Sequence, residues 1–147
     1  MKQIYLPILI ILLPLISMPL PANILDDLQI DSSYKIEVYA SGLDSPRQLA
    51  ESDDGWIFLG SRSGGSVFAI RDTDGNGVSD EKVLVADGLT MPTGVSIFNG
   101  DLFFSEIDRI WKIENIDALL MKSSAELPKK ILVTDNLPSD KWHGWKW

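Results

Sequence analysis

Residues 71–83, RDTDGNGVSDEKV, place oxygen-bearing side chains at alternate positions around a glycine-rich turn. The candidate metal ligands are Asp72, Asp74, Asn76, Val78 and Asp80. They correspond to positions 1, 3, 5, 7 and 9 of a calcium-binding loop, with Val78 acting through its carbonyl. Gly77 stands at position 6, where the sharp turn requires glycine. Because such spacing points hard oxygen ligands at one cation, the pattern predicts a calcium site of mainly structural role.

The match to a calcium loop is incomplete. Position 12, which carries a bidentate glutamate in the complete motif, is Val83, and Glu81 lies two residues too early. No helix is predicted on either side of the loop. The alternative is a solvated hairpin loop in which the Asp and Gly residues only form turns.

His143, the only histidine of the chain, is the second candidate for chemistry. It lies between Trp142 and Trp145 in the phrase LPSDKWHGWKW. An imidazole titrates near neutral pH and can act as a general base. Flanking tryptophans can exclude water or stack on a sugar ring. The alternative is a structural histidine in a core of large aromatic side chains.

Composition narrows the classes of function. The 147 residues carry a net charge of −8 without clustered Lys or Arg, which argues against a nucleic-acid partner. The absence of cysteine excludes disulfides, thiol catalysis and cysteine-type zinc sites. The length suits about one domain.

Residues 1–22 have the pattern of a secretory signal peptide. Lys2 precedes an apolar run from Ile4 to about Met18, and small residues follow up to the expected cleavage point at Ala22. The alternative, an uncleaved membrane anchor, is disfavoured by four prolines at positions 7, 14, 19 and 21. We therefore expect a periplasmic or secreted protein without a stable membrane span after cleavage.

Three similar phrases recur along the chain: VYASGL at 38–43, VLVADGL at 83–89 and ILVTDNL at 131–137. Their leucines, Leu43, Leu89 and Leu137, lie 46 and 48 residues apart. A period of this length with four short strands is typical of a β-propeller blade. The predicted fold class is all-β.

The strands are predicted from runs rich in Val, Ile, Phe and Trp. We expect a lone entering strand at Lys35–Ala40, strands at 47–52, 56–62, 65–71 and 82–87, and a second set at 94–98, 102–106, 109–113 and 129–135. Asp54-Gly55 and Asn99-Gly100 predict tight hairpin turns. A short helix through Leu120, capped by Asn115 or Asp117, is expected between the last two strands.

Residues 34–147 are therefore predicted to form a partial β-propeller of two blades and the start of a third. Propellers close with four to eight blades, so two blades leave apolar faces open. We expect this chain to be the N-terminal portion of a longer protein. The alternative is a two-blade protein that closes by forming an oligomer.

Four phrases together resemble the N-terminal half of the L-sorbosone dehydrogenase-like proteins, which belong with the soluble quinoprotein glucose and aldose sugar dehydrogenases. They are YASGLDSPRQLAESDDGWIFLGSR, RDTDGNGVSDE, ADGLTMPTGVSIFNGDLFFSE and DNLPSDKWHGWKW, and the resemblance covers about Tyr34 to Trp147. It implies a six-bladed propeller, pyrroloquinoline quinone (PQQ) as cofactor, a calcium ion that holds the quinone, and periplasmic oxidation of aldoses or sugar aldehydes. It does not specify the electron acceptor.

The resemblance also implies a role for His143. In that family, a histidine at this place takes the proton of the anomeric hydroxyl while hydride passes to PQQ. The glucose enzymes carry Asp directly before this histidine, whereas this chain has Trp142, so their substrate does not carry over. The resemblance implies that the residues that bind PQQ and its calcium lie in later blades. We therefore expect the loop at 72–80 to be a separate metal site and the isolated chain to be inactive.

Two other functions remain open from the sequence. One is a gluconolactonase-type propeller hydrolase, in which Glu, Asp and Asn hold a catalytic metal. The matching N-terminal metal-binding Glu is not evident in this chain. The other is a non-catalytic propeller module that binds a partner or a carbohydrate.

Overall fold

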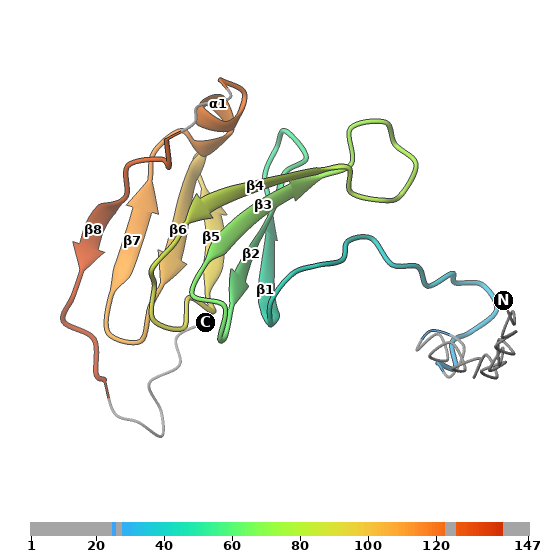
Figure 1. Cartoon of the computed structure of the whole chain (residues 1–147), viewed down its shortest axis with the longest axis horizontal. Coiled ribbons are helices and arrows are strands. Elements are labelled where there is room, and N and C mark those ends of the chain that lie inside the picture. The colour runs from blue at the N-terminus through green and yellow to red at the C-terminus, as the bar shows by residue number, and fades with distance from the viewer. Residues whose placement is uncertain (1–24, 26–27, 123–125, 140–147) are drawn as a thin grey trace, which may run out of the picture. The chain divides into compact units, whose positions relative to one another are not determined.

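The computed structural model describes residue 25, residues 28–122 and residues 126–139 (Figure 1). The chain divides into two units, residues 1–37 and 38–147, and the strands of the described residues all lie in the second unit. The predicted signal peptide at residues 1–22 lies outside the described residues. Within the described ranges, no helix has the length and apolar character needed to cross a membrane.

The second unit consists of two four-stranded antiparallel sheets, each built from strands that are consecutive in sequence. The first sheet contains β1 (Pro46–Glu51), β2 (Ile57–Ser61), β3 (Val67–Arg71) and β4 (Glu81–Ala86). The second contains β5 (Val95–Phe98), β6 (Asp101–Ser105), β7 (Ile110–Ile113) and β8 (Ile131–Thr134). The all-β prediction is confirmed, and each of the eight strands predicted in the two sets is present.

The predicted strand at Lys35–Ala40 is wrong. These residues have no strand pairing in the described part of the chain. A strand requires a neighbouring backbone for its ladder of hydrogen bonds, and here the carbonyl of Tyr39 accepts only the N–H of Ser79, at 2.8 Å.

The two predicted hairpin turns differ in their geometry. Asn99 and Gly100 both have positive φ, 52° and 79°, as a two-residue type I′ turn requires. In the turn between β1 and β2, Gly55 has positive φ (78°) but Asp54 does not, because three residues, 53–55, separate the bonded pair Ser52 and Trp56. Ser52 donates its N–H to the carbonyl of Trp56 at 2.9 Å and accepts the N–H of Gly55 at 3.1 Å.

The predicted short helix is present as α1 (Ile116–Leu120), although its expected cap is not. Asn115 occupies the N-cap position in a left-handed conformation and makes no side-chain capping bond. Its N–H instead bonds the Asp101 carboxylate at 3.0 Å, and Ile116 donates to the carbonyl of Gly100 at 3.0 Å. The helix is therefore held by the β5–β6 turn and not by its own sequence.

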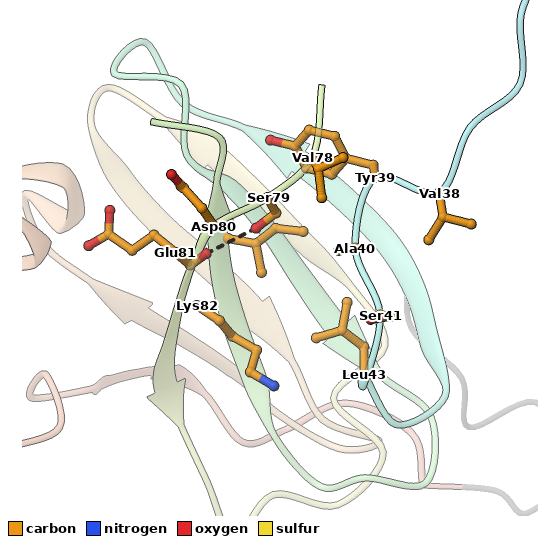
Figure 2. A pocket seen from close by; sticks show the side chains of 11 residues that line it. Val38, Tyr39, Ala40, Ser41, Leu43, Val78, Ser79, Asp80, Glu81 and Lys82 are labelled. Atoms are coloured by element: carbon orange, nitrogen blue, oxygen red, sulfur yellow. Dashed lines mark hydrogen bonds between the residues drawn. The ribbon is translucent and has the colours of Figure 1, made fainter. Parts of the chain in front are cut away.

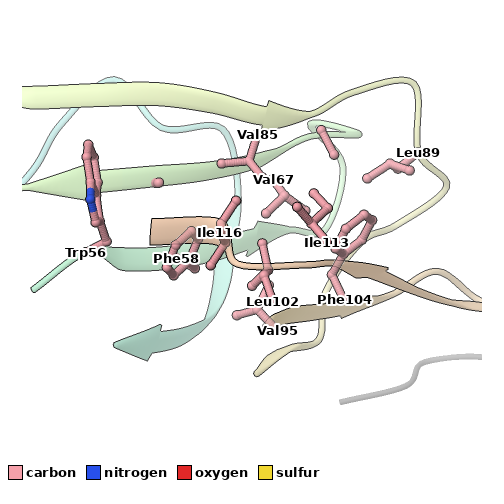
Figure 3. Packing of buried hydrophobic residues seen from close by; sticks show 12 residues of the cluster. Trp56, Phe58, Val67, Val85, Leu89, Val95, Leu102, Phe104, Ile113 and Ile116 are labelled. Carbon is pink, nitrogen blue, oxygen red and sulfur yellow. The ribbon is translucent and has the colours of Figure 1, made fainter. Parts of the chain in front are cut away.

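One hydrophobic core lies between the two sheets (Figure 3). Trp56, Phe58 and Val67 contribute from the first sheet, and Leu102 and Phe104 contribute from the second; all are at most 1% exposed. Full burial of such a side chain stabilises the fold by about 1.5–3 kcal/mol. Packing between the sheets, more than propensity, therefore fixes their arrangement.

The strand registers show which face of each sheet enters this core. In the first sheet the cross-strand row Ala50, Phe58, Ala69 and Val83 faces the second sheet. In the second sheet, the row at the same distance from the first hairpin is Ser96, Phe103, Lys112 and Ile131. This second row lies outside the core, and Ser96 and Ile131 are exposed.

The second sheet buries its other face, whose counterpart in the first sheet lies outside the core. The second sheet enters the core with Val95, Phe104 and Trp111, while Leu132 at the end of the same row is 44% exposed. Its counterpart in the first sheet is the row Leu49, Leu59, Phe68 and Leu84, which lies outside that core. The sheets thus pack with unlike faces, and the face that each sheet leaves outside the core corresponds to the face that the other sheet buries.

Candidate functional site

The acidic loop joins β3 to β4, and its base is closed by bonds between the two strands. Asp80 donates its N–H to the carbonyl of Arg71 at 3.1 Å. The guanidinium of Arg71 forms an ion pair with Glu81 at 2.8 Å and lies 4.3 Å from the centre of the Trp56 ring. The loop is therefore anchored to a fully buried tryptophan of the core.

Asp72 organises the interior of the loop. Its Oδ1 accepts the N–H groups of Gly75 at 2.8 Å and Asn76 at 3.3 Å, and its Oδ2 accepts that of Gly77 at 2.8 Å. Gly77 has φ 88°, which only glycine adopts readily. These bonds, with that from Gly77 the strongest, lower the pKa of Asp72, so that the carboxylate is charged at neutral pH.

Asp80 is bound within the loop in a similar way. Its carboxylate accepts the hydroxyl of Thr73 at 2.6 Å and the N–H of Thr73 at 3.0 Å. The hydroxyl bond is the main reason that the pKa of Asp80 is lowered, while the nearby charge of Asp72 acts in the opposite direction. Two ionised carboxylates therefore belong to one short, exposed loop.

The remaining predicted ligands also bond inside the loop. The side-chain amide of Asn76 donates to Asp74 at 3.1 Å, and its oxygen accepts the N–H of Val78 at 2.8 Å. Among the described residues, no three Asp, Glu, His or Cys side chains are gathered in a way that would hold a metal ion. Each oxygen that accepts a single bond, such as Oδ2 of Asp72, retains a second lone pair, and a calcium loop also uses amide and carbonyl oxygens. The calcium site therefore stays a prediction.

His143, with Trp142 and Trp145, lies outside the described residues. Of the segment LPSDKWHGWKW, the described residues include only Leu137, Pro138 and Ser139. Leu137 donates its N–H to the carbonyl of Asp108 at 3.1 Å, which places the start of the phrase beside the β6–β7 turn.

The acidic loop and Leu137 lie at opposite ends of the sheets. The acidic loop follows β3 and α1 follows β7, and these two connections share one end (Figure 1). Leu137 follows β8, which returns to the other end. A five-residue strand spans about 16 Å, so the structure does not bring the acidic loop together with Leu137.

The end of the sheets near Leu137 also carries two loops of matching conformation. Gly42 and Gly88 both have φ 67°. Ser45 (48°) and Met91 (52°), each directly before a proline, are non-glycine residues with positive φ. Residues before proline avoid helical conformations, so this geometry is strained. Its occurrence in both loops confirms that the phrases around Leu43 and Leu89 are structural repeats.

Glu106, a buried residue at the same end that is 7% exposed, is not among the residues predicted from the sequence. Its Oε1 accepts the N–H of Thr90 and its Oε2 accepts the indole N–H of Trp111, both at 2.6 Å. The Arg109 guanidinium lies 3.9 Å away. Glu106 therefore ties the strained loop before β5 to the second sheet.

A pocket of about 230 Å³ lies between residues 38–43 and the start of β4 (Figure 2). Tyr39 and Leu43 line one side, and Ser79 and Lys82 line the other. The Lys82 ammonium donates to the carbonyl of Gly42 at 3.3 Å and thereby holds the two sides together. The pocket adjoins the acidic loop but contains no set of groups arranged for catalysis.

Comparison with known proteins gives one distant relative. No model of a known protein family matches the chain. An uncharacterized protein of Borreliella burgdorferi is 28% identical over 102 residues, which are 69% of this chain and 25% of that protein. The chain therefore spans about a quarter of the length of the curated relative that it matches.

Proposed function

We propose that this chain is the N-terminal part of an exported, PQQ-dependent sugar dehydrogenase of the β-propeller type. Its substrate class is an aldose or a sugar aldehyde that is oxidised at the C1 hydroxyl. The proposal rests on the resemblance of residues 34–147 to the L-sorbosone dehydrogenase-like proteins.

The observation that carries the propeller part of this proposal is the use of unlike faces. The buried Phe58 row of the first sheet has its counterpart in the open Phe103 row of the second. A third sheet of the same kind can therefore pack on the second as the second packs on the first. Repetition of one such contact gives a ring of blades, and a relative four times as long as the match has room for further sheets.

The described residues do not by themselves fit PQQ. The end of the sheets that holds Leu137 is rich in carboxylates, including Asp87, Glu106 and Asp108. Arg109, which could meet a quinone carboxylate, is bound by Asp108 at 2.8 Å. The resemblance assigns the cofactor residues to later blades, and we expect the 147-residue chain alone to be inactive.

His143 is the residue of this chain that we assign to catalysis. In the neutral form its imidazole would accept the proton of the C1 hydroxyl, a step that an imidazole performs well near neutral pH. Trp142 and Trp145 would limit access of water to that proton. PQQ, when bound, supplies the acceptor for the hydride.

The test is dye reduction by the full-length protein that contains this chain, with PQQ, calcium chloride and a panel of aldoses and sugar aldehydes. We expect His143→Ala to lower kcat/KM by about 10²–10⁴-fold while circular dichroism stays unchanged. Lys35→Ala, at an exposed position (76%), should leave turnover unchanged. Full turnover in His143→Ala would instead favour the hydrolase or the non-catalytic module.

We also propose that the loop at residues 72–80 binds one calcium ion that stabilises the loop. Calorimetric titration of calcium chloride into the chelator-treated chain should give one site. Asp72→Asn should weaken it by about tenfold or more, because it removes a charged oxygen ligand. Asp53→Asn, in the other acidic turn, is the matched control. Equal affinity in the Asp72 variant, or no heat in the parent, would contradict the assignment.

A further inference from the structure

A second and larger hollow, of about 880 Å³, lies between β4 and the segment that contains α1. Residues 81–84 of β4 form one side. Leu119, Leu120 and Lys122 of the α1 region, followed by residues 126–129 and Ile131, form the other. We call this hollow the β4–α1 groove. Its volume lies within the usual range of ligand sites, about 300–1,000 Å³.

The β4 side of the groove is a strand edge. Side chains of a strand alternate between two faces, yet four successive residues, 81–84, line the groove. β4 pairs only with β3. The described residues provide no backbone hydrogen bond to its other edge between Lys82 and Ala86. An unpaired edge is a template on which another extended chain can form a ladder.

The other side of the groove is apolar. Leu127 and Ile131 line it with 49% and 38% of their surface exposed. Val83, Leu84 and Leu119 line it as half-buried side chains. An extended ligand can therefore place every second side chain on apolar surface while its backbone follows β4.

The charges of the groove favour an acidic ligand. Two of its three carboxylates, at Glu81 and Glu114, are already paired with Arg71 and Lys112, each at 2.8 Å, and Glu126 is the third. The ammonium groups of Lys122 and Lys129 have no ion pair or side-chain hydrogen bond within the described ranges. With Lys82, whose ammonium donates to the carbonyl of Gly42, the groove has three lysines against the one remaining carboxylate of Glu126, an excess of two positive charges on a chain whose net charge is −8.

We propose that the β4–α1 groove binds an extended acidic peptide, which adds to β4 as a fifth strand of the first sheet. Main-chain bonds to β4 supply affinity, and alternate apolar side chains rest against Leu127 and Ile131. Carboxylates of the peptide meet Lys122 and Lys129. The groove lies at the end of the sheets opposite Leu137, so this proposal does not depend on the proposed dehydrogenase activity.

The probe for this proposal is a fluorescein-labelled octapeptide in which valine alternates with threonine and glutamate. Its anisotropy is titrated with the full chain. We expect saturation below about 1 mM and a loss of affinity of about tenfold in the double variant Lys122→Glu, Lys129→Glu. The same double variant should gain affinity for the peptide in which lysine replaces glutamate. Lys35→Glu, outside the groove, should change neither titration.

A second probe separates strand addition from other occupants. N-methylation of alternate peptide amides removes donors that a ladder on β4 requires, so we expect one of the two methylation patterns to abolish binding. Retained binding of both methylated peptides would overturn the proposal in favour of a site for small anionic amphiphiles. Failure of the unmethylated peptide to saturate would also overturn the proposal. So would dimers of the chain, seen in sedimentation, that dissociate when the peptide is added, since the natural occupant of the groove would then be a second copy of the chain.

Discussion

Replacement of Gly60 with alanine is expected to lower the free energy of unfolding by about 3 kcal/mol. Gly60 is buried in β2, where the segment before β5 passes directly over it. A Cβ atom there would lie 2.2 Å from the carbonyl oxygen of Pro92 and 2.9 Å from that of Thr93. Both are backbone atoms, so relief requires the two sheets to separate locally.

Urea unfolding followed by tryptophan fluorescence measures this loss. Gly55→Ala is the control because nothing lies within 4 Å of the Cβ position of Gly55, so the only cost there is the positive φ of +78°. That variant should lose only about 1–2 kcal/mol, through backbone strain. Equal losses in the two variants would show that the contact between β2 and residues 92–93 does not restrict the sheets.

The strands could be predicted from sequence because their cause is local. Alternating β-branched and aromatic residues between turn signals, as in WIFLGSR and RIWKI, define a half-buried strand without knowledge of its partners. Lys35–Ala40 has a similar composition but forms no strand. Its ladder depends on a neighbour that the described part of the chain does not supply.

The close approach at Gly60 could not be predicted for the opposite reason. Pro92 lies 32 residues away in sequence, and a glycine inside a strand pattern indicates only that some backbone comes near. The spacing around Asp72 predicted a sharply turning loop, and its internal bonds to Gly75 and Gly77 follow from that turn. Which end of the sheets the loop occupies follows only from the complete strand order.

The burial of Glu106 could not be predicted from its neighbours in the sequence either. A lone glutamate after FFS resembles a solvated residue at a strand end, and charged residues are seldom buried unless paired. Its partners are a backbone N–H sixteen residues earlier, at Thr90, and the indole of Trp111. The structure alone shows that one carboxylate joins the strained loop at Met91 to the second sheet.

Replacement of Glu106 with alanine is expected to destabilise the fold by about 2 kcal/mol. The change leaves the Thr90 N–H and the Trp111 indole N–H without their acceptor, and because both hydrogen bonds are only part-buried, each loss lies near the lower end of the range of about 1–3 kcal/mol for an unsatisfied donor. The same denaturant titration measures the loss. Hydrogen exchange at the Thr90 amide should rise in parallel, because the loop before β5 loses its tether to the second sheet.

Glu106→Gln separates the hydrogen bonds from the volume of the side chain. Its carbonyl oxygen can accept one of the two N–H groups, but its NH₂ then meets the other as donor against donor. The glutamine variant should therefore lose close to half as much stability as the alanine variant and protect only one of the two N–H groups from exchange. If the Glu106→Gln variant matches the parent protein in free energy of unfolding and in hydrogen exchange, the shape of the side chain holds the loop, and its acceptance of the two N–H groups does not. Met91 would then owe its strained conformation to packing around Pro92 instead of to the carboxylate.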